Sequence, residues 1–287
     1  MRMICTARKE AGGGGDVMEN TFISTPIAPE ALLAWYLDMG VDESIGEEPL
    51  DRLAAPTFKP TISAPPPSRP SASVSPLKVL TPHPSASALA SQAKSLPELR
   101  HALDIFEDCP LKKTATNLVF GDGNPEAKIM FIGEAPGADE DRIGLAFVGD
   151  GGKLLDKMLF SIGLDRSNSY ITNLLPWRPP GNRTPTPAEI AACLPFIERH
   201  IELVDPDVLI LLGGISAASL LASHEGIGKL RGKWHEYETP GLSRPLPTFA
   251  TFHPNYLIKS PAQKRDAWKD LLAIKAKLTE LGIKARR

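Results

Sequence analysis

From residue 98 onward, short apolar runs alternate with longer stretches in which apolar residues recur every three or four positions. Periods of this kind distinguish buried strands from amphipathic helices. The short runs predict strands over residues 127–133, 169–175, 207–213 and 248–252. The longer stretches predict helices over residues 152–162, 187–204, 215–223 and 261–281. Such alternation predicts a parallel sheet with helices on both faces, an α/β fold.

The first 97 residues have a different pattern. An apolar stripe over residues 28–39 predicts a short helix, followed by an acidic stretch, and ten prolines lie between Pro56 and Pro97. A Pro-, Ala- and Ser-rich stretch without apolar periodicity is typical of a disordered linker. The short helix either docks a partner or packs on its own domain. The predicted parts are a disordered N-terminus (1–27), a helical docking element (28–52), a linker (53–97) and a catalytic domain (98–287).

A glycine-rich loop, residues 133–152, follows the first predicted strand. Glycines let the backbone turn sharply and approach a ligand closely. A phosphate site is disfavoured, because no lysine of the GxxxxGK[ST] type follows and the acidic run at residues 139–141 would repel phosphate. The alternatives are a site for a flat ligand and an ordinary turn between a strand and a helix.

Polar side chains follow three predicted strands. Glu134 and Glu140 follow the first, Asn173 ends the second and His253 ends the last. Ligand sites in open α/β sheets lie at the carboxyl ends of the strands. A carboxamide both donates and accepts hydrogen bonds, so Asn173 can pair with the edge of a base. An imidazole N–H can stabilise negative charge that develops on an oxygen. Taken singly, Asn173 could instead be a helix cap and His253 a turn residue.

Charge adds a candidate partner. The net charge is −2, yet residues 259–287 carry nine Lys and Arg against three acidic residues. Such a segment suits a phosphate backbone, although solvated helix faces look similar. The chain has no apolar segment of signal-peptide or membrane-helix length, which predicts a cytoplasmic protein.

Five motifs in a fixed order carry a family resemblance. They are Gly133-Glu-Ala-Pro-Gly137, Phe147-Val-Gly149, Ile171-Thr-Asn173, Arg178-Pro-Pro180 with Asn182-Arg183, and His253-Pro254 followed by Tyr256-Leu257. Their order and spacing over about residues 99–275 resemble the family 4 uracil-DNA glycosylases. The resemblance implies a three-layer α/β/α fold around a parallel four-stranded sheet. It also implies hydrolysis of the N-glycosidic bond of uracil in DNA during base excision repair.

The resemblance assigns roles by position. Phe147 would stack on the flipped base, Asn173 would read its polar edge, and His253 would bond a uracil oxygen. Glu140 would help to place the attacking water. The substrate-binding set is Gly133, Glu134, Ala135, Pro136, Gly137, Phe147, Asn173 and His253, with the backbone of Glu134 and Ala135 touching the base. The DNA-binding set is Arg178, Asn182, Arg183, Leu257 and Lys259, with Leu257 entering the duplex as the base leaves.

One position shifts the expected chemistry. The better-known first family of these enzymes has an aspartate where this chain has Ala135. A strong general base is therefore missing there, and stabilisation of the leaving group should carry more of the rate.

The cofactor of the resembled family is a second departure. Family 4 members usually hold an iron–sulfur cluster on four cysteines, and the matching positions here are Phe106, Cys109, Trp177 and Cys193. A cluster normally needs four thiolates, and Cys5 lies across the predicted linker. We therefore expect no metal and no cofactor, with Phe106 and Trp177 as an apolar plug beside two buried free thiols.

Other functions remain open at this stage. A related covalent branch captures the abasic sugar with a histidine near the Arg-Pro-Pro motif, and residues 174–195 contain no histidine. The alternatives are a catalytically weak DNA-binding or docking protein and a glycosylase for another deaminated base. The expected partners are uracil-containing single- or double-stranded DNA and a repair or replication protein at the N-terminal arm. We expect a monomer in a bacterial-type cytosol or nucleoid, without membrane contact.

Overall fold

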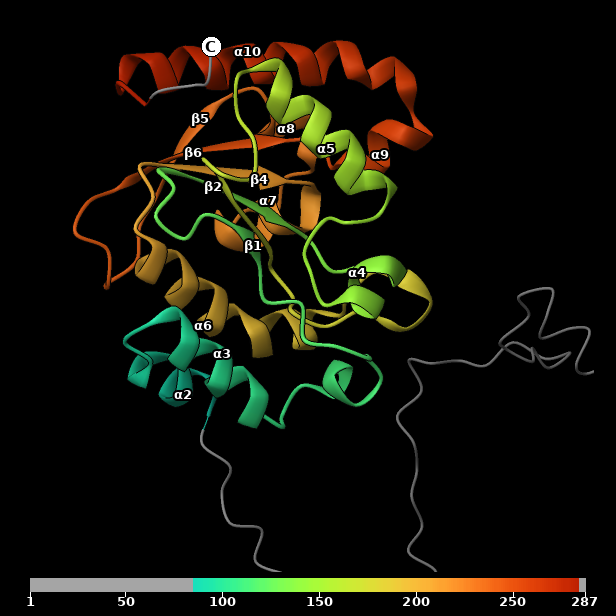
Figure 1. The fold of residues 1–287 in the computed structure, drawn as a ribbon, viewed down its shortest axis with the longest axis vertical. Coiled ribbons are helices and arrows are strands. Elements are labelled where there is room, and N and C mark those ends of the chain that lie inside the picture. Colours follow the sequence, from blue (N-terminus) through green and yellow to red (C-terminus); the bar gives the residue numbers. More distant parts are fainter. Residues whose placement is uncertain (1–84, 284–287) are drawn as a thin grey trace, which may run out of the picture. The chain divides into compact units, whose positions relative to one another are not determined.

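The computed structural model describes residues 85–283. Figure 1 shows one sheet with helices on both of its faces. The predicted N-terminus, the docking element, Cys5 and most of the predicted linker lie outside the described residues.

The sheet has six strands in the order β1-β3-β2-β4-β6-β5. Their bounds are β1 Asp122–Gly123, β2 Ile129–Gly133, β3 Tyr170–Asn173, β4 Val208–Leu212, β5 Trp234–Tyr237 and β6 Leu246–Thr251. The four inner strands pair in parallel, which confirms the predicted sheet. The two edge strands run antiparallel and were not predicted. β1 has too few residues for a periodic pattern, and β5 is partly exposed and lacks an apolar run.

The helices of the described region are α2 Ala86–Gln92, α3 Leu96–Ile105, α4 Ala138–Ile143, α5 Asp150–Ser161, α6 Pro187–Val204, α7 Gly214–Leu220, α8 Ile227–Leu230, α9 Pro254–Lys259 and α10 Lys264–Glu280. Short 3-10 turns are η1 Pro110–Lys113, η2 Pro180–Asn182 and η3 Pro261–Gln263. The predicted bounds of α6 are confirmed. Thr186 and Glu189 form a capping box at its start, and Asp205 ends it in a left-handed conformation.

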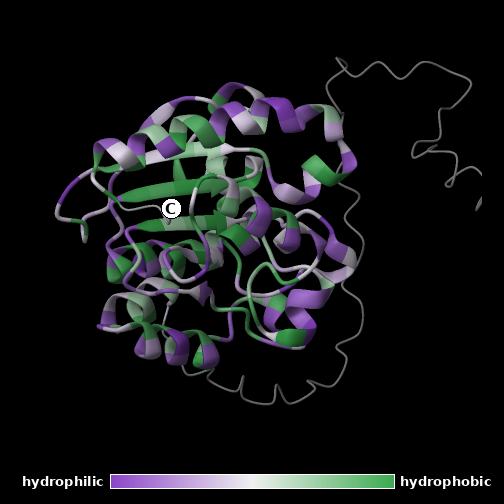
Figure 2. Cartoon of the chain, turned by 45° about the horizontal axis from the view of Figure 1, so that its top comes forward, coloured by the Kyte–Doolittle hydropathy of each residue, from purple (hydrophilic) through white to green (hydrophobic). Residues whose placement is uncertain are grey.

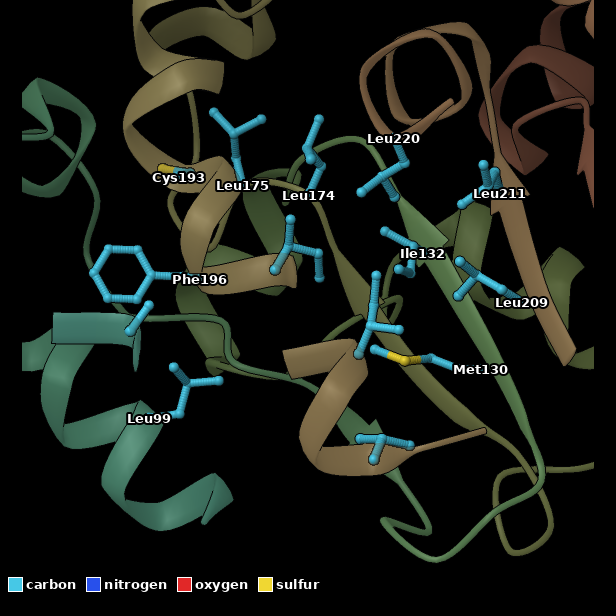
Figure 3. Close-up of a cluster of buried hydrophobic side chains, with 14 of the residues drawn as sticks. Leu99, Met130, Ile132, Leu174, Leu175, Cys193, Phe196, Leu209, Leu211 and Leu220 are labelled. Carbon is cyan, nitrogen blue, oxygen red and sulfur yellow. The ribbon is translucent and has the colours of Figure 1, made fainter. Parts of the chain in front are cut away.

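Side chains on the two faces of the strands form two separate cores. Met130, Ile132, Leu209 and Leu211 belong to the core on the side of α3, α6 and α7, and Figure 3 shows them beside Leu220. The intervening strand residues, such as Ile129 and Phe131, belong to the core with α5 and α10. Strands buried on both faces explain the continuous apolar runs of the sequence, which form the green centre of Figure 2.

The predicted linker ends too late in the sequence. Residues 86–92 form α2, and Leu89, Ala90 and Ala93 are buried. This helix packs against α6, and Arg199 of α6 donates from Nε to the Ala93 carbonyl at 2.8 Å. Ser85 caps the helix by accepting from the backbone N–H of Ala88. The linker boundary at residue 97 is therefore wrong, because a Pro- and Ser-rich composition hid a short apolar face.

Within residues 85–283, every helix is too short or too polar to cross a lipid bilayer.

The packing of α2 predicts a stability effect. Leu89→Ala should lower the free energy of unfolding by about 2–4 kcal/mol, because it removes buried methyl groups and leaves a cavity. Gln92→Ala, on the exposed side of the same helix, is the matched control. Denaturant unfolding of both variants measures the effect. Equal stability of the Leu89 variant and the wild type would mean that α2 is not part of the folded domain.

Candidate active site

The candidate site lies where the inner parallel strands end. Gly133 is the last residue of β2 and Asn173 the last residue of β3, and the two are paired in the sheet. Gly213 follows β4, and His253 comes two residues after β6. The fold therefore brings the predicted strand-end residues to one edge of the sheet, as expected for a parallel α/β sheet.

Gly133 is the most crowded point of this edge. A Cβ built on it would lie 2.4 Å from Oδ1 of Asn173 and 2.5 Å from Cζ of Phe147. Both distances are far shorter than any normal contact of a Cβ atom. Glycine at this position therefore lets the Asn173 carboxamide and the Phe147 ring meet over the end of β2.

The Asn173 carboxamide has an unused acceptor. The residue is 5% exposed, and its Oδ1 has no hydrogen-bond partner within the described part of the chain. A buried acceptor without a partner costs about 1–3 kcal/mol. Native proteins rarely keep such a group without a reason. The oxygen is thus placed to receive an N–H group from a ligand.

Phe147 and His253 form an aromatic pair beside this amide. Their ring centroids are 5.5 Å apart, and the ring planes differ by 26°. Phe147 is buried, and its backbone has the left-handed φ of 55°, which is uncommon for a residue with a large side chain. The two predicted base-contacting rings are therefore neighbours in the structure.

The contacts of His253 favour one neutral tautomer. His253 is the N-cap of α9, and its Nδ1 accepts from the backbone N–H of Asn255 at 3.1 Å. Nδ1 therefore carries no proton, and the ring proton is on Nε2. Burial lowers the pKa of His253 to about 4. At neutral pH the ring is an uncharged donor.

Glu140 joins the two ends of the glycine-rich loop. One carboxylate oxygen accepts from the backbone N–H of Gly137 at 3.0 Å, and the other accepts from that of Gly149 at 2.8 Å. This arrangement fixes the start of α4 relative to the start of α5. Its predicted role in placing water stays a prediction.

A cavity of about 640 Å³ opens beside these residues. Its walls include residues 134–137, His253 and Lys259, together with Asn182 and Arg183 from the loop before α6. Asn173 and Phe147 do not line the cavity. His253 connects them to it, because its ring lines the cavity and also contacts the Phe147 ring. Much of the predicted substrate-binding set therefore lines one cavity.

The Glu134 side chain faces a helix start at this cavity. Its Oε1 accepts from the backbone N–H of Ile215 in α7 at 3.0 Å. Burial raises the pKa of Glu134, and the backbone hydrogen bonds oppose that effect. The carboxyl group thus holds the loop after β2 against α7. Its backbone contact with a base remains a prediction.

The two arginines of the predicted DNA-binding set already bond other side chains. Arg178 donates from Nε to Oδ1 of Asn182 at 2.7 Å. Arg183 makes a forked pair with Glu189 at 2.9 and 2.6 Å and keeps 44% of its side chain exposed. The hydrogen bond from Arg183 lowers the pKa of Glu189 to about 2. Phosphate contacts by Arg178, Asn182 and Arg183 stay predictions.

The prediction that Leu257 enters the duplex is corrected by its burial. Leu257 is 1% exposed and belongs to the core with α5 and α10. The exposed apolar side chains of α9 are its neighbours Tyr256 and Ile258, each 43% exposed and each lining the cavity. The motif placed Leu257 after His253, but it did not reveal that residues 254–259 form a helix or which side of that helix faces solvent.

The positions of the family's cluster ligands do not fit an iron–sulfur cluster. Cys109 and Cys193 are fully buried, with their Sγ atoms 3.8 Å apart. Phe106 and Trp177, 2% and 3% exposed, fill the other two positions in the same core. Among residues 85–283, no three His, Cys, Asp or Glu side chains gather as metal ligands do. The thiols present are too few for the Cys₄ ligand set of such a cluster.

Sequence reasoning missed several residues of the site. Ile215 and Ile227 line the cavity from α7 and α8, and Thr184 and Pro185 line it from the loop before α6. Arg166, in the turn before β3, contacts the Phe147 backbone. None of these belongs to a motif, so their neighbours in space, rather than in sequence, identify them.

Comparison with known proteins gives consistent matches. The model of the uracil DNA glycosylase superfamily matches residues 120–272. The chain is 39% identical over 185 residues to the type-4 uracil-DNA glycosylase of Archaeoglobus fulgidus, covering 63% of this chain and 92% of that protein. It is 41% identical over 153 residues to the type-4 enzyme of Thermotoga maritima, covering 53% and 77%. A type-5 uracil-DNA glycosylase of Thermus thermophilus is 35% identical over 142 residues, covering 44% and 62%.

The environment of His253 predicts its titration. Its NMR signal should titrate with a midpoint near pH 4 rather than 6.5, because burial disfavours the charged ring. The unfolded chain binds a proton on this residue between these values and the folded chain does not, so stability should fall as the pH drops from 6.5 to 4. A midpoint near 6.5 would contradict the lowering of the His253 pKa by burial.

Proposed function

This chain belongs to the uracil DNA glycosylase superfamily, and we propose that it hydrolyses the N-glycosidic bond of uracil in DNA as a base excision repair enzyme. Type-4 uracil-DNA glycosylases are its relatives over most of their own length. The observation that carries the proposal for the site is the buried, unpaired Oδ1 of Asn173.

Base recognition follows from that oxygen. The N3–H of uracil is a donor, so it pairs with Oδ1 of Asn173 when the base is flipped out of the helix. Cytosine has a lone pair at N3, which would leave two acceptors facing each other. A site built to bond a donor strongly rejects an analogue that lacks it. Phe147 supplies an aromatic face beside the same amide.

His253 stabilises the leaving group in this proposal. As the bond between N1 of uracil and C1′ of the sugar breaks, negative charge spreads to the uracil oxygens. The neutral imidazole donates its Nε2 proton in a hydrogen bond to O2 and keeps that proton. A donor already oriented by the Asn255 N–H needs little reorganisation during the reaction. Water then attacks C1′ and its proton ends on the departing uracil anion, because Ala135 offers no carboxylate to accept it.

Glu140 remains the proposed residue for placing that water. Each of its oxygens accepts one backbone N–H, and each carboxylate oxygen has a second lone pair. A water bonded there would be held at the loop that flanks the cavity. The same carboxylate therefore braces the loop and orients the nucleophile.

Contacts with the duplex come from the cavity rim. Extruding a base costs about a few kcal/mol, least for a mismatched base. We propose that Ile258 or Tyr256, rather than Leu257, fills the space that the base leaves. Lys259, Arg178 and Arg183 contribute phosphate contacts, which would make binding weaker at high salt.

The remaining assignments are proposals too. Residues 28–52 are proposed to dock a repair or replication protein, with residues before α2 serving as the link to the catalytic domain. The protein is proposed to act as a monomer in the cytoplasm, on single- or double-stranded DNA.

Replacing Asn173 tests the proposed function. Asn173→Ala should lose uracil excision by about 100-fold or more, because the N3–H of the base goes unread. Asn124→Ala, in the turn before β2 at the other end of the sheet, is the control. Cleavage of a labelled oligonucleotide with one uracil, followed by alkali, measures both. Near-normal excision by the Asn173 variant would refute this role.

The proposed absence of a cluster has its own test. Cys109→Ala and Cys193→Ala should each retain uracil excision, because neither thiol holds iron. The wild-type protein should contain no stoichiometric iron and no visible absorption band. If the wild type contained iron, and either variant lost both that iron and its activity, the proposed apolar plug of Phe106 and Trp177 would be refuted.

A further inference from the structure

Phe147 is held in an unfavourable backbone conformation. A non-glycine residue in the left-handed region costs about 1–3 kcal/mol and persists only when its surroundings fix it. The φ of Phe147 is 55°. Its carbonyl oxygen also lies against the first turn of α5, where a Cβ built on Gly152 would come within 1.7 Å of that oxygen. The loop therefore needs partners that hold this carbonyl in place.

Arg166 supplies those partners. Its NH1 group donates to the carbonyl of Ala146 at 2.9 Å, and its NH2 group donates to the carbonyl of Phe147. The planar side chain of Arg166 thus bonds the peptide group before Phe147 and the peptide group after it. The guanidinium group of arginine is suited to this because its donors have a fixed geometry.

Two carboxylates also bond the guanidinium group. Asp122 in the edge strand β1 accepts from NH1, and Asp156 in α5 accepts from Nε at 2.9 Å. Arg166 itself lies in a turn closed by a bond from the Asp165 backbone N–H to Oδ1 of Asn168. The side chain is 26% exposed, so much of it is shielded from solvent. Its four bonded partners leave it little freedom to move.

We propose that Arg166 is a positioning residue for uracil excision, which acts by holding the Ala146 and Phe147 carbonyls and so fixing the Phe147 ring beside Asn173 and His253. The inference rests on the proposed function, because Phe147 is there the face on which the base stacks. Arg166 needs no contact with substrate for this role, because it bonds the backbone on either side of Phe147.

Lysine cannot replace this arrangement. Its ammonium group keeps the charge but lacks the planar fork that reaches two carbonyls and two carboxylates together. Arg166→Lys should leave the Phe147 backbone free to relax from its left-handed conformation. A displacement of about 1 Å at a positioning group costs as much as about 100-fold in rate.

A second arginine in the chain provides a matched control. Arg244 donates to Asp205 at 3.0 Å, to Asp207 at 2.6 Å and to the Pro206 carbonyl at 3.2 Å. It therefore also bonds two carboxylates and a backbone carbonyl. These partners lie before β4, at the opposite end of the sheet from the site. Arg244→Lys should leave uracil excision unchanged.

A double-mutant cycle tests the inference. Single-turnover uracil excision is measured for the wild type, Arg166→Lys, Phe147→Ala and the double variant. Arg166→Lys should lower the rate by about 10- to 100-fold. The double variant should be no slower than Phe147→Ala alone, because the arginine has then lost the ring through which it acts. A merely structural role would instead slow excision in both backgrounds by the same factor.

Two results would overturn the inference. One is an Arg166→Lys enzyme as fast as the wild type, and the other is losses that multiply in the double variant. Should Arg166→Lys fail to fold in a thermal unfolding test, Asp156→Asn weakens the same group from a 48% exposed position and should show a smaller loss with the same dependence on Phe147. A wild-type enzyme that excises no uracil would refute the proposed function itself, whatever the variants do.

Discussion

The site depends on the absence of a side chain at Gly133. Because β2 ends in glycine, the Asn173 carboxamide and the Phe147 ring can occupy the space over the strand end. The sheet pairs Gly133 with Asn173, so the position of the amide is set by the same hydrogen bonds that hold the core strands together. The rigid sheet therefore fixes the amide proposed to read the base, whereas the position of the Phe147 ring depends on a loop. That loop is held by Glu140, which bonds Gly137 and Gly149, and by Arg166, which bonds the Phe147 carbonyl.

Burial affects the two polar side chains of the site, Asn173 and His253, in different ways. Among residues 85–283 it leaves Oδ1 of Asn173 without a hydrogen-bond partner, which costs stability until a donor arrives. It also keeps the His253 ring neutral, so the ring donates without bringing a net charge into the site. Because Ala135 stands in place of an aspartate, the proposed mechanism relies on stabilising the departing uracil. In the proposed function, Asn173 reads the base and His253 stabilises the anion that the base becomes.

Part of this arrangement could be predicted from sequence, and the rest depends on tertiary packing. Apolar runs located the parallel strands, and apolar residues recurring every three or four positions located α6. Asn173 and His253 could be found because strand ends of a parallel sheet converge. The burial of Leu257 could not, because it depends on α5 and α10 packing over α9. The role of Arg166 was equally hidden, since its partners come from β1, α5 and the Phe147 loop.

Two isomers of methyluracil test the central claim most directly. In 1-methyluracil the methyl group takes the place of the sugar and leaves N3–H free, whereas 3-methyluracil lacks that donor. Each is added as a competitor to the excision of uracil from a labelled oligonucleotide. The account predicts that 1-methyluracil inhibits the wild type and that 3-methyluracil does not. It also predicts that the Asn173→Ala variant does not distinguish between the two isomers. Equal inhibition of the wild type by both isomers would contradict recognition of N3–H by Asn173.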